Sequence, residues 1–220
     1  MRQPHGGQDP GVALQVRLDY LSERALEALV PISFVVARTP IEIDVVLRMR
    51  YECVTEMGWA TPEDLPDERE RDEYDEGATF IVCREEGEII GSARLVPPAS
   101  GELLPAEREF KIGLEPPGRP VEVGRVIVQP RFRSGRSHLI LAGLFARSWL
   151  VARELGYDRV ISTASTELID LYRGLGLRVT VLTAPKLSWG EERSLIELSA
   201  TESSLIPLAR AVGVDPLKFE

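Results

Sequence analysis

The sequence has few of the side chains that bind metals or form cross-links. Its 220 residues include two cysteines, Cys53 and Cys83, and two histidines, His5 and His138. None of the four stands in a spacing typical of metal ligands, and two histidines leave little room for a Ser-His-Asp triad. We therefore expect no metal site, no such triad, and thiols that stay reduced.

Long apolar runs and an excess of basic residues are also missing. The longest apolar run, around Leu139 to Leu150, is interrupted by Arg147, and the polar N-terminus lacks the apolar core of a signal peptide. The 26 basic residues are outnumbered by 35 acidic ones, which gives a formal net charge of −9. We expect a soluble, cytoplasmic protein with no membrane span and no nucleic-acid partner.

Charge is unevenly distributed along the chain. Acidic residues concentrate in Glu63–Glu76, and arginines gather in Arg125–Arg136. A basic segment in an otherwise acidic protein is typical of a protein that binds an acidic partner or a phosphate group.

The order of apolar periods and turn residues predicts an α/β fold. We expect a loose arm over residues 1–12 and a helix from Leu14 to Val30, so that residues 1–31 precede one domain over 32–220. The expected elements are strand 32–37, helix 39–56 capped by Thr39 and Pro40, hairpin strands 78–84 and 88–96, a long connection 97–120 with room for a short helix, strand 121–129, helix 137–155, strand 159–163, helix 165–174, and strands 177–183 and 193–200. This order predicts a mixed sheet, antiparallel in its middle, with helices on its faces.

The segment Val121–Leu144 is the most informative part of the chain. An apolar strand ends at Gln129-Pro130, and an apolar helix begins with Ser137 as its expected N-cap. The loop between them carries Arg131, Arg133, Gly135 and Arg136. A helix N-terminus beside guanidinium groups favours an anion such as the phosphate of a coenzyme A or carrier-protein arm. The alternative is an ordinary crossover with surface arginines.

A second motif, Leu171-Tyr172-Arg173-Gly174-Leu175-Gly176-Leu177, ends a helix and enters a strand. With the strand, arginine loop and helix before it, this segment resembles the LYxxxGF signature of the GNAT-superfamily acyltransferases. The resemblance implies that Tyr172 protonates a leaving thiolate; the alternative is a tyrosine packed in the core. The loop has one glycine, Gly135, where that superfamily usually has two, which favours the single phosphodiester of a phosphopantetheine carrier over a pyrophosphate.

Four further pieces occur in a fixed order. They are Met57-Gly58-Trp59, Glu70-Arg71-Asp72-Glu73-Tyr74-Asp75, Arg94-Leu95-Val96-Pro97 and Glu122-Val123-Gly124-Arg125. Together they resemble the acyl-homoserine-lactone synthases, a GNAT-related family, over most of the chain. The resemblance implies an invariant set at Trp59, Asp72, Asp75, Arg94, Glu122 and Arg125, and places the family's helix arginine at Arg48 after a one-residue insertion. The family's phenylalanine has no clear counterpart, because Glu52 or Cys53 stands at its place.

The same charged residues carry a chemical argument of their own. Arg94 and Arg125 each interrupt an apolar strand, and a charge in mid-strand is costly unless it is paired, so we expect both to point toward carboxylates. Glu122 is the best candidate for a general base that deprotonates an amine. The backbone of Val126 to Val128 is expected to polarise the thioester carbonyl and to hold the pantetheine arm like an added strand. The alternative is that these ion pairs serve structure alone.

These residues predict an N-acyltransferase that moves an acyl chain from the thioester of an acyl carrier protein, or of coenzyme A, to an α-amine. The resemblance implies that the acceptor is S-adenosylmethionine and that lactonisation then gives an acyl-homoserine lactone. We expect no permanently bound cofactor, and an acyl carrier protein as partner. The alternatives are an N-acyl amino acid synthase that does not use S-adenosylmethionine, and a non-catalytic module that binds acyl thioesters. Trp189, in the loop before the last strand, is expected to pack or to line the acyl pocket.

Overall fold

The fold was examined in a computed structural model that describes residues 10–114, 120–133, 137–174, 177–199, 206, 207, 209, 210 and 213–215. The helices are α1 (Pro10–Ala28), α2 (Pro40–Glu56), α3 (Pro105–Phe110), α4 (Ser137–Glu154) and α5 (Thr166–Gly174), with short 3-10 turns at Asp75–Gly77 and Pro130–Phe132. The strands are β1 (Ser33–Val36), β2 (Thr79–Glu85), β3 (Glu88–Val96), β4 (Val121–Val128), β5 (Val160–Ala164), β6 (Arg178–Val181), β7 (Lys186–Ser188) and β8 (Glu191–Ser199). The sequence prediction missed β7.

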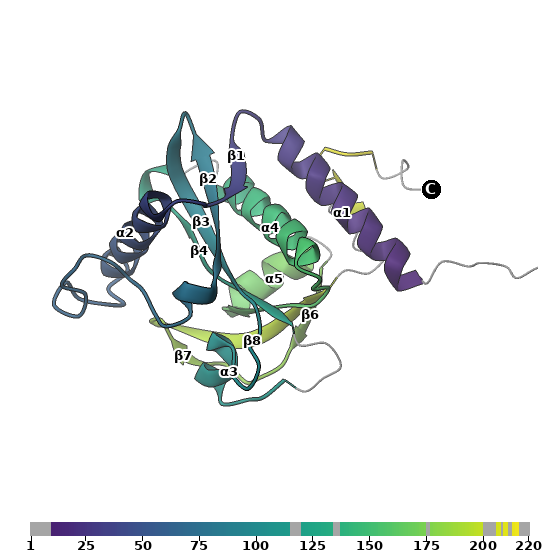
Figure 1. The fold of residues 1–220 in the computed structure, drawn as a ribbon. Coiled ribbons are helices and arrows are strands. Elements are labelled where there is room, and N and C mark those ends of the chain that lie inside the picture. Colours follow the sequence, from purple (N-terminus) through teal and green to yellow (C-terminus); the bar gives the residue numbers. More distant parts are fainter. Residues whose placement is uncertain are drawn as a thin grey trace, which may run out of the picture.

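The strands form a mixed, mostly antiparallel sheet with helices on its faces, as the sequence predicts (Figure 1). Their order is β1-β2-β3-β4-β5-β8-β6, and β7 pairs with β8 outside this path. The parallel pair is β4 with β5, and it spans two register positions, Val121 opposite Val160 and Glu122 opposite Ile161. Past Glu122 the two strands therefore diverge.

Local sequence signals set several element ends. The Thr39 side chain accepts a hydrogen bond from the Glu42 backbone, and the Glu42 side chain accepts one from the Thr39 backbone, which forms a capping box at the start of α2. Glu86 and Gly87 both have positive φ, as a two-residue hairpin turn between β2 and β3 requires. These two predictions are confirmed.

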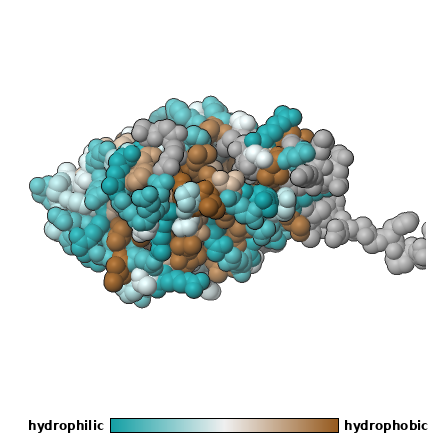
Figure 2. Space-filling model, turned by 90° about the horizontal axis from the view of Figure 1, so that it is seen from above, coloured by the Kyte–Doolittle hydropathy of each residue, from teal (hydrophilic) through white to brown (hydrophobic). Residues whose placement is uncertain are grey.

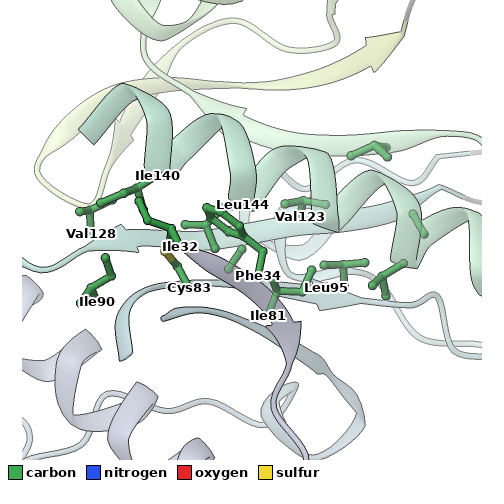
Figure 3. Close-up of a cluster of buried hydrophobic side chains, with 14 of the residues drawn as sticks. Ile32, Phe34, Ile81, Cys83, Ile90, Leu95, Val123, Val128, Ile140 and Leu144 are labelled. Atoms are coloured by element: carbon green, nitrogen blue, oxygen red, sulfur yellow. The ribbon is translucent and has the colours of Figure 1, made fainter. Parts of the chain in front are cut away.

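Helices α2 and α4 lie on opposite sides of the strands β1 to β4 (Figure 1). The main core lies between α4 and the sheet, where Ile140 and Leu144 of α4 point toward Val128, Val123 and the neighbouring strands (Figure 3). Gly143 stands where an added Cβ would lie 2.1 Å from the Phe34 ring. The absence of a side chain at this position lets the Phe34 ring pack directly on α4.

Helix α1 lies on the outer side of α4 (Figure 1). The Trp149 indole N–H of α4 donates a 2.6 Å hydrogen bond to Asp19 of α1, and Leu26 packs against the main core. The helix begins at Pro10 rather than at Leu14, so the predicted arm is too long; residues 1–9 of that arm lie outside the described part of the chain. The N-terminal helix is packed on the same core as the domain that follows it.

The surface carries hydrophobic side chains in patches separated by hydrophilic ones on the face seen in Figure 2. Among the described residues, none of the helices combines the length and the apolar composition that a membrane span needs.

Candidate active site

Strand β4 is distorted where it meets β3. Gly91, Ser92 and Arg94 of β3 pair with Val128, Ile127 and Gly124 of β4, so β4 holds one residue more than β3 within this interval. The extra residue forms a β-bulge at Arg125 and Val126, and Arg125 has a φ of +49°. Bulges of this kind re-aim side chains and are frequent beside active sites.

The edge of β4 that faces β5 is open beyond the bulge. In the described part of the chain, β5 pairs with β4 at Val121 and Glu122, and no other strand pairs with that edge at Val126 or Val128. Backbone groups at such an edge can accept an extended ligand as an additional strand. The structure thus places the predicted thioester strand at an available edge.

Charged side chains of the acidic segment Glu70–Asp75 and of α2, β3 and β4 form a buried network beside the bulge. Arg50 of α2 donates from Nε to Glu70 and from Nη1 to Asp75 Oδ1, the latter at 2.8 Å. Arg94 of β3 donates from Nη1 to Asp72 Oδ1 and to Asp75 Oδ1, each at 2.6 Å. The Arg50 and Arg94 side chains are 1% and 2% exposed. The inward orientation predicted for Arg94 is therefore confirmed.

Arg125 completes this network from the bulge. Its Nη2 lies 3.1 Å from Glu70 Oε1 and 3.2 Å from Asp72 Oδ2, and its side chain is 23% exposed. We call Arg50, Glu70, Asp72, Asp75, Arg94 and Arg125 the charge network. Each guanidinium contacts two carboxylates, so the loop that precedes β2 is fixed to α2, β3 and β4 at once.

The network keeps its buried carboxylates ionised. Burial by itself would raise the pKa of Glu70, but the hydrogen bond from Arg50 and the charge of Arg125 outweigh it, so this pKa lies below its usual value. Burial likewise opposes ionisation of Asp75, and the charges and hydrogen bonds of Arg50 and Arg94 lower its pKa. The site therefore holds fixed, alternating charges around neutral pH.

The helix arginine of this network is Arg50, which corrects the assignment of Arg48. Arg48 is half exposed and forms an ion pair with Asp44 one turn earlier in α2, at 2.9 Å. Arg50 shares the buried face of α2 with Val46 and Val54, at intervals of four residues. Helical periodicity, rather than spacing from Trp59, would have identified it. The sequence reasoning also missed Glu70 as a member, although it begins the acidic motif.

Glu122 is a buried carboxyl group beside this network. It is 6% exposed, and its Oε2 accepts a 2.8 Å hydrogen bond from the backbone N–H of Ala106 in α3. Burial raises its pKa to about 7, although the Ala106 hydrogen bond and the charges of Arg94 and Arg125 oppose the shift. A carboxyl group with this pKa can exchange a proton near neutral pH, which is what a general base for an amine requires.

A cavity of about 650 Å³ lies near Glu122. Its wall includes Tyr74, Val96, Pro97 and Leu103, and Val96 is the β3 residue directly opposite Glu122. The Tyr74 hydroxyl is buried and has no hydrogen-bond partner among the described residues. The wall also includes the charged residues Glu73, Glu102 and Arg108, so the cavity offers both apolar and polar contacts.

Two tryptophans stand at the outer side of the charge network. Trp59, predicted to bind substrate, follows α2 and meets Trp189 edge to face, with ring centroids 6.3 Å apart. The Arg125 guanidinium lies 4.4 Å from the centroid of the Trp189 ring. Trp189 therefore packs on the charge network, and its contact with Trp59 brings both rings to the same site.

Tyr172 lies in the hydrophobic core on α5. Its ring contacts Phe145 edge to face at 5.4 Å and packs with Ala164, Ile169 and Ile196. Burial raises the pKa of its hydroxyl, so the group stays protonated at all ordinary pH values. This placement agrees with the core alternative for the ring, and a neutral hydroxyl is also the form that donates a proton.

The arginine loop after β4 is tied to its neighbours where it is described. Arg131 forms an ion pair with Glu88, and Arg133 donates to the Val128 carbonyl at 3.0 Å and to Glu56 at 2.8 Å. Gly135 and Arg136 lie outside the described residues, as do Leu175 and Gly176 of the second motif. The two described arginines are thus already paired with protein groups, which differs from the open anion site that the sequence predicts.

The described residues contain no cluster of three or more His, Cys, Asp or Glu side chains arranged to hold a metal ion.

The open sheet edge, the bulge and the buried base candidate are features of an acyltransferase. A family model described as an acetyltransferase (GNAT) domain matches residues 49–143. An acyl-homoserine-lactone synthase of Ralstonia solanacearum is 32% identical over 153 residues, which cover 64% of this chain and 74% of that protein. The chain belongs to the acyl-homoserine-lactone synthase family.

Solved structures agree with this fold. A coenzyme A-dependent acyl-homoserine lactone synthase, BjaI, with SAM and isopentyl-CoA, superposes with a TM-score of 0.62 at 23% identity and covers 83% of this chain and 89% of that one. TofI, in a ternary complex with an inhibitor and MTA, gives 0.61 at 22% identity, covering 84% and 98%. FeeM, an N-acyl amino acid synthase, gives 0.54 at 17% identity, covering 77% and 90%. At these identities the likeness is one of fold.

Proposed function

We propose that this chain transfers an acyl group from a thioester to the α-amine of S-adenosylmethionine and that the product closes to an acyl-homoserine lactone. The observation that carries the proposal is the position of Glu122. Its buried carboxyl group has a pKa of about 7 and lies at the last β4 residue paired with β5, just before the bulge that carries Arg125 and the open strand edge. Family membership supports the choice of reaction.

Each step can be assigned to a group of this chain. Ionised Glu122 takes a proton from the acceptor ammonium, directly or through a water molecule, and the free amine attacks the thioester carbonyl. Backbone groups of β4 from Val126 to Val128 hold the thioester arm and stabilise the developing oxyanion. Collapse forms the amide bond, breaks the carbon–sulfur bond of the thioester and releases a thiolate, which takes up the proton that the attacking nitrogen gives up. A carboxylate oxygen of the acylated S-adenosylmethionine then attacks the methylene carbon bonded to the sulfonium sulfur. The new carbon–oxygen bond closes the lactone, and the breaking carbon–sulfur bond releases the adenosyl thioether.

The charge network serves the acceptor in this proposal. S-adenosylmethionine carries a carboxylate, an ammonium and a sulfonium group, and Asp72, Asp75, Arg94 and Arg125 offer charges of both signs in fixed positions. Trp59 adds an aromatic ring, which attracts cations. The cavity walled by Tyr74 and Val96 provides space for an apolar or aromatic portion of a substrate.

The acyl donor is an acyl carrier protein in the preferred form of this proposal, with coenzyme A as the alternative. The single glycine of the arginine loop, Gly135, favours a phosphodiester over a pyrophosphate, and the arginines at 131, 133 and 136 suit an acidic carrier. Both donors are cytoplasmic metabolites or proteins, which agrees with the cytoplasmic location expected from the sequence.

A second candidate is an N-acyl amino acid synthase on the same scaffold. The observation that favours it is the lack of the phenylalanine that, by the resemblance, helps to shape the S-adenosylmethionine pocket. Cys53 stands near that place; it is buried, and its Sγ accepts a hydrogen bond from Arg133 Nη2 at 3.4 Å. The acceptor would then be an amino acid without a sulfonium group, and no lactone would form.

One experiment separates these candidates. The purified protein is incubated with a mixture of acyl carrier protein and coenzyme A thioesters, with S-adenosylmethionine or with a set of amino acids, and the product masses are read. We expect acyl-homoserine lactone in the S-adenosylmethionine arm, and a loss of product with Glu122→Gln. Acyl amino acids in the other arm would favour the second candidate, and no product with any acceptor would contradict both.

A further inference from the structure

A stack of two arginines and two tryptophans closes the outer side of the charge network. The Arg125 guanidinium lies 4.4 Å from the Trp189 ring centroid, Trp189 meets Trp59 edge to face at 6.3 Å, and the Arg193 guanidinium lies 5.2 Å from the Trp59 ring centroid. We call these four side chains the arginine–tryptophan stack. It joins the β4 bulge, the β7–β8 turn, the end of α2 and strand β8.

The turn that carries Trp189 is built in an unfavourable backbone conformation. Ser188 pairs with Glu191, so Trp189 and Gly190 form a two-residue turn, and their φ values are +51° and +70°. Positive φ is ordinary for glycine and rare for a bulky residue such as tryptophan. A large side chain held in this conformation has to be retained by contacts elsewhere.

Trp59 fits closely over this turn. A Cβ added to Gly190 would lie 2.5 Å from Trp59 Cδ1 and 2.6 Å from Nε1. Such distances are far below van der Waals contact, so any side chain at position 190 would displace the Trp59 ring. The positive φ values of the turn and the glycine at position 190 therefore both permit the contact between Trp59 and Trp189.

Arg125 has the same unusual backbone conformation on the other side of the contact. Its φ is +49°, and its side chain is the most exposed of the three network arginines, at 23% against 1% for Arg50 and 2% for Arg94. An acceptor that enters from solvent therefore meets Arg125 before it meets the buried Arg50 and Arg94. The face of Trp189 covers this guanidinium and restricts the positions that it can occupy.

We propose that Trp189 is a positioning residue for the acceptor: it holds Arg125 in the orientation in which the charge network receives an α-amino acid substrate. This inference rests on the proposed function for the identity of the acceptor. It requires the aromatic face of residue 189, because the contact with Arg125 is a cation–π contact. It assigns no direct chemical step to Trp189.

The test compares Trp189→Leu, which keeps apolar bulk without an aromatic face, with Trp189→Phe, which keeps a face. We expect Trp189→Leu to raise the KM for S-adenosylmethionine by about two- to thirty-fold, the range expected for loss of one cation–π contact. The KM for the acyl donor should stay within about two-fold, and Trp189→Phe should recover most of the acceptor affinity. Trp149→Phe is the matched control, because Trp149 contacts Asp19 of α1. Equal changes in both KM values, or no difference between Leu and Phe, would overturn the inference.

A second measurement does not depend on turnover. Melting temperatures are measured for Trp189→Leu, Arg125→Gln and the double variant, since glutamine removes the cationic group that faces the Trp189 ring. We expect the double variant to lose less stability than the sum of the two single variants, because both remove the same contact. Additive losses would overturn the contact between the two residues. Coupled losses together with no activity toward S-adenosylmethionine would instead contradict the proposed function and leave the contact in place.

Discussion

Glu122 shows how burial can make one residue suited to base catalysis. Its carboxyl group is buried in the protein and accepts a hydrogen bond from the Ala106 backbone N–H, but it forms no ion pair with the neighbouring arginines among the described residues, so its ionised form is poorly solvated. Burial also opposes ionisation of Glu70 and Asp75 in the charge network, yet the arginines that contact them lower both pKa values and keep them ionised. Position relative to the guanidinium groups thus separates the base candidate from the structural anions.

The first prediction concerns the pH dependence of catalysis. Glu122 acts as a base only when ionised, and its pKa is raised to about 7, so kcat/KM should rise with pH around a midpoint near that value. Glu122→Gln should lower turnover by about 10²–10⁴-fold and abolish this midpoint. The measurement is the pH–rate profile of both proteins with saturating donor. An unchanged midpoint in the variant would assign the titration to another group.

The second prediction concerns stability: Glu122→Gln, which should lower activity, should make the folded protein more stable at high pH. The folded-state pKa of Glu122 lies above its unfolded value of 4.5, so the folded protein binds this proton more tightly. The stabilisation is complete below the unfolded pKa and is lost as pH rises through about 7. Glu122→Gln should therefore stabilise the protein relative to wild type at pH 8, and much less at pH 5, which a comparison of melting temperatures at the two pH values measures. The difference in the free energy of unfolding is on the order of 3 kcal/mol at most. A variant that is less stable at pH 8 would contradict burial as the cause of the shift.

The third prediction uses two arginines of one helix. Arg50→Ala removes one of the two arginines that contact each of Glu70 and Asp75, in a buried environment, and should cost about 3–5 kcal/mol of the free energy of unfolding. Arg48→Ala removes an exposed ion pair with Asp44 and should cost about 1 kcal/mol or less. Chemical denaturation of both variants measures the difference. Similar losses would show that the buried pair contributes no more than the exposed one.

At the scale of elements, the sequence predicts what depends on local chemistry. The capping box fixes the start of α2, and the positive φ values of Glu86 and Gly87 fit the hairpin expected from Glu-Glu-Gly. Strand β7 has three residues and its pairing depends on the turn at Trp189, so no period marks it. The bulge at Arg125 and the divergence of β4 from β5 depend on how strands meet, which a one-dimensional pattern does not contain.

The same division holds for the candidate site. Charges that interrupt apolar strands predicted Arg94 and Arg125 correctly as network members, because an unpaired charge in a strand is costly. Spacing from Trp59 points to Arg48 as the arginine that α2 contributes to the charge network, and this prediction is wrong. The helical period places Arg50, and not Arg48, on the buried face of α2. The role of Trp189 depends on a contact across three elements, so the sequence alone placed the residue only in a loop.

At the scale of the whole molecule, charge bears on the acyl carrier protein that we propose as donor. The chain has a net charge of −9, and acyl carrier proteins are acidic, so the proposed pair would repel each other except where arginines face the carrier. The structure partly neutralises these arginines, because Arg131 pairs with Glu88 and Arg133 with Glu56. A carrier has to compete with both pairs, which are exposed and therefore weak.

The fourth prediction follows from this balance. Replacing Arg131, Arg133 and Arg136 with Ala should raise KM for an acyl carrier donor much more than for a short pantetheine thioester, because the short donor lacks the acidic protein surface. Salt should weaken activity with the carrier in the wild-type protein and have less effect in the triple variant. Glu88→Gln is the matched control: it frees Arg131 from its ion pair and should lower the KM for the carrier. Equal losses with both donors and no salt effect would mean that the arginines contact only the arm, and coenzyme A would then be the better donor assignment.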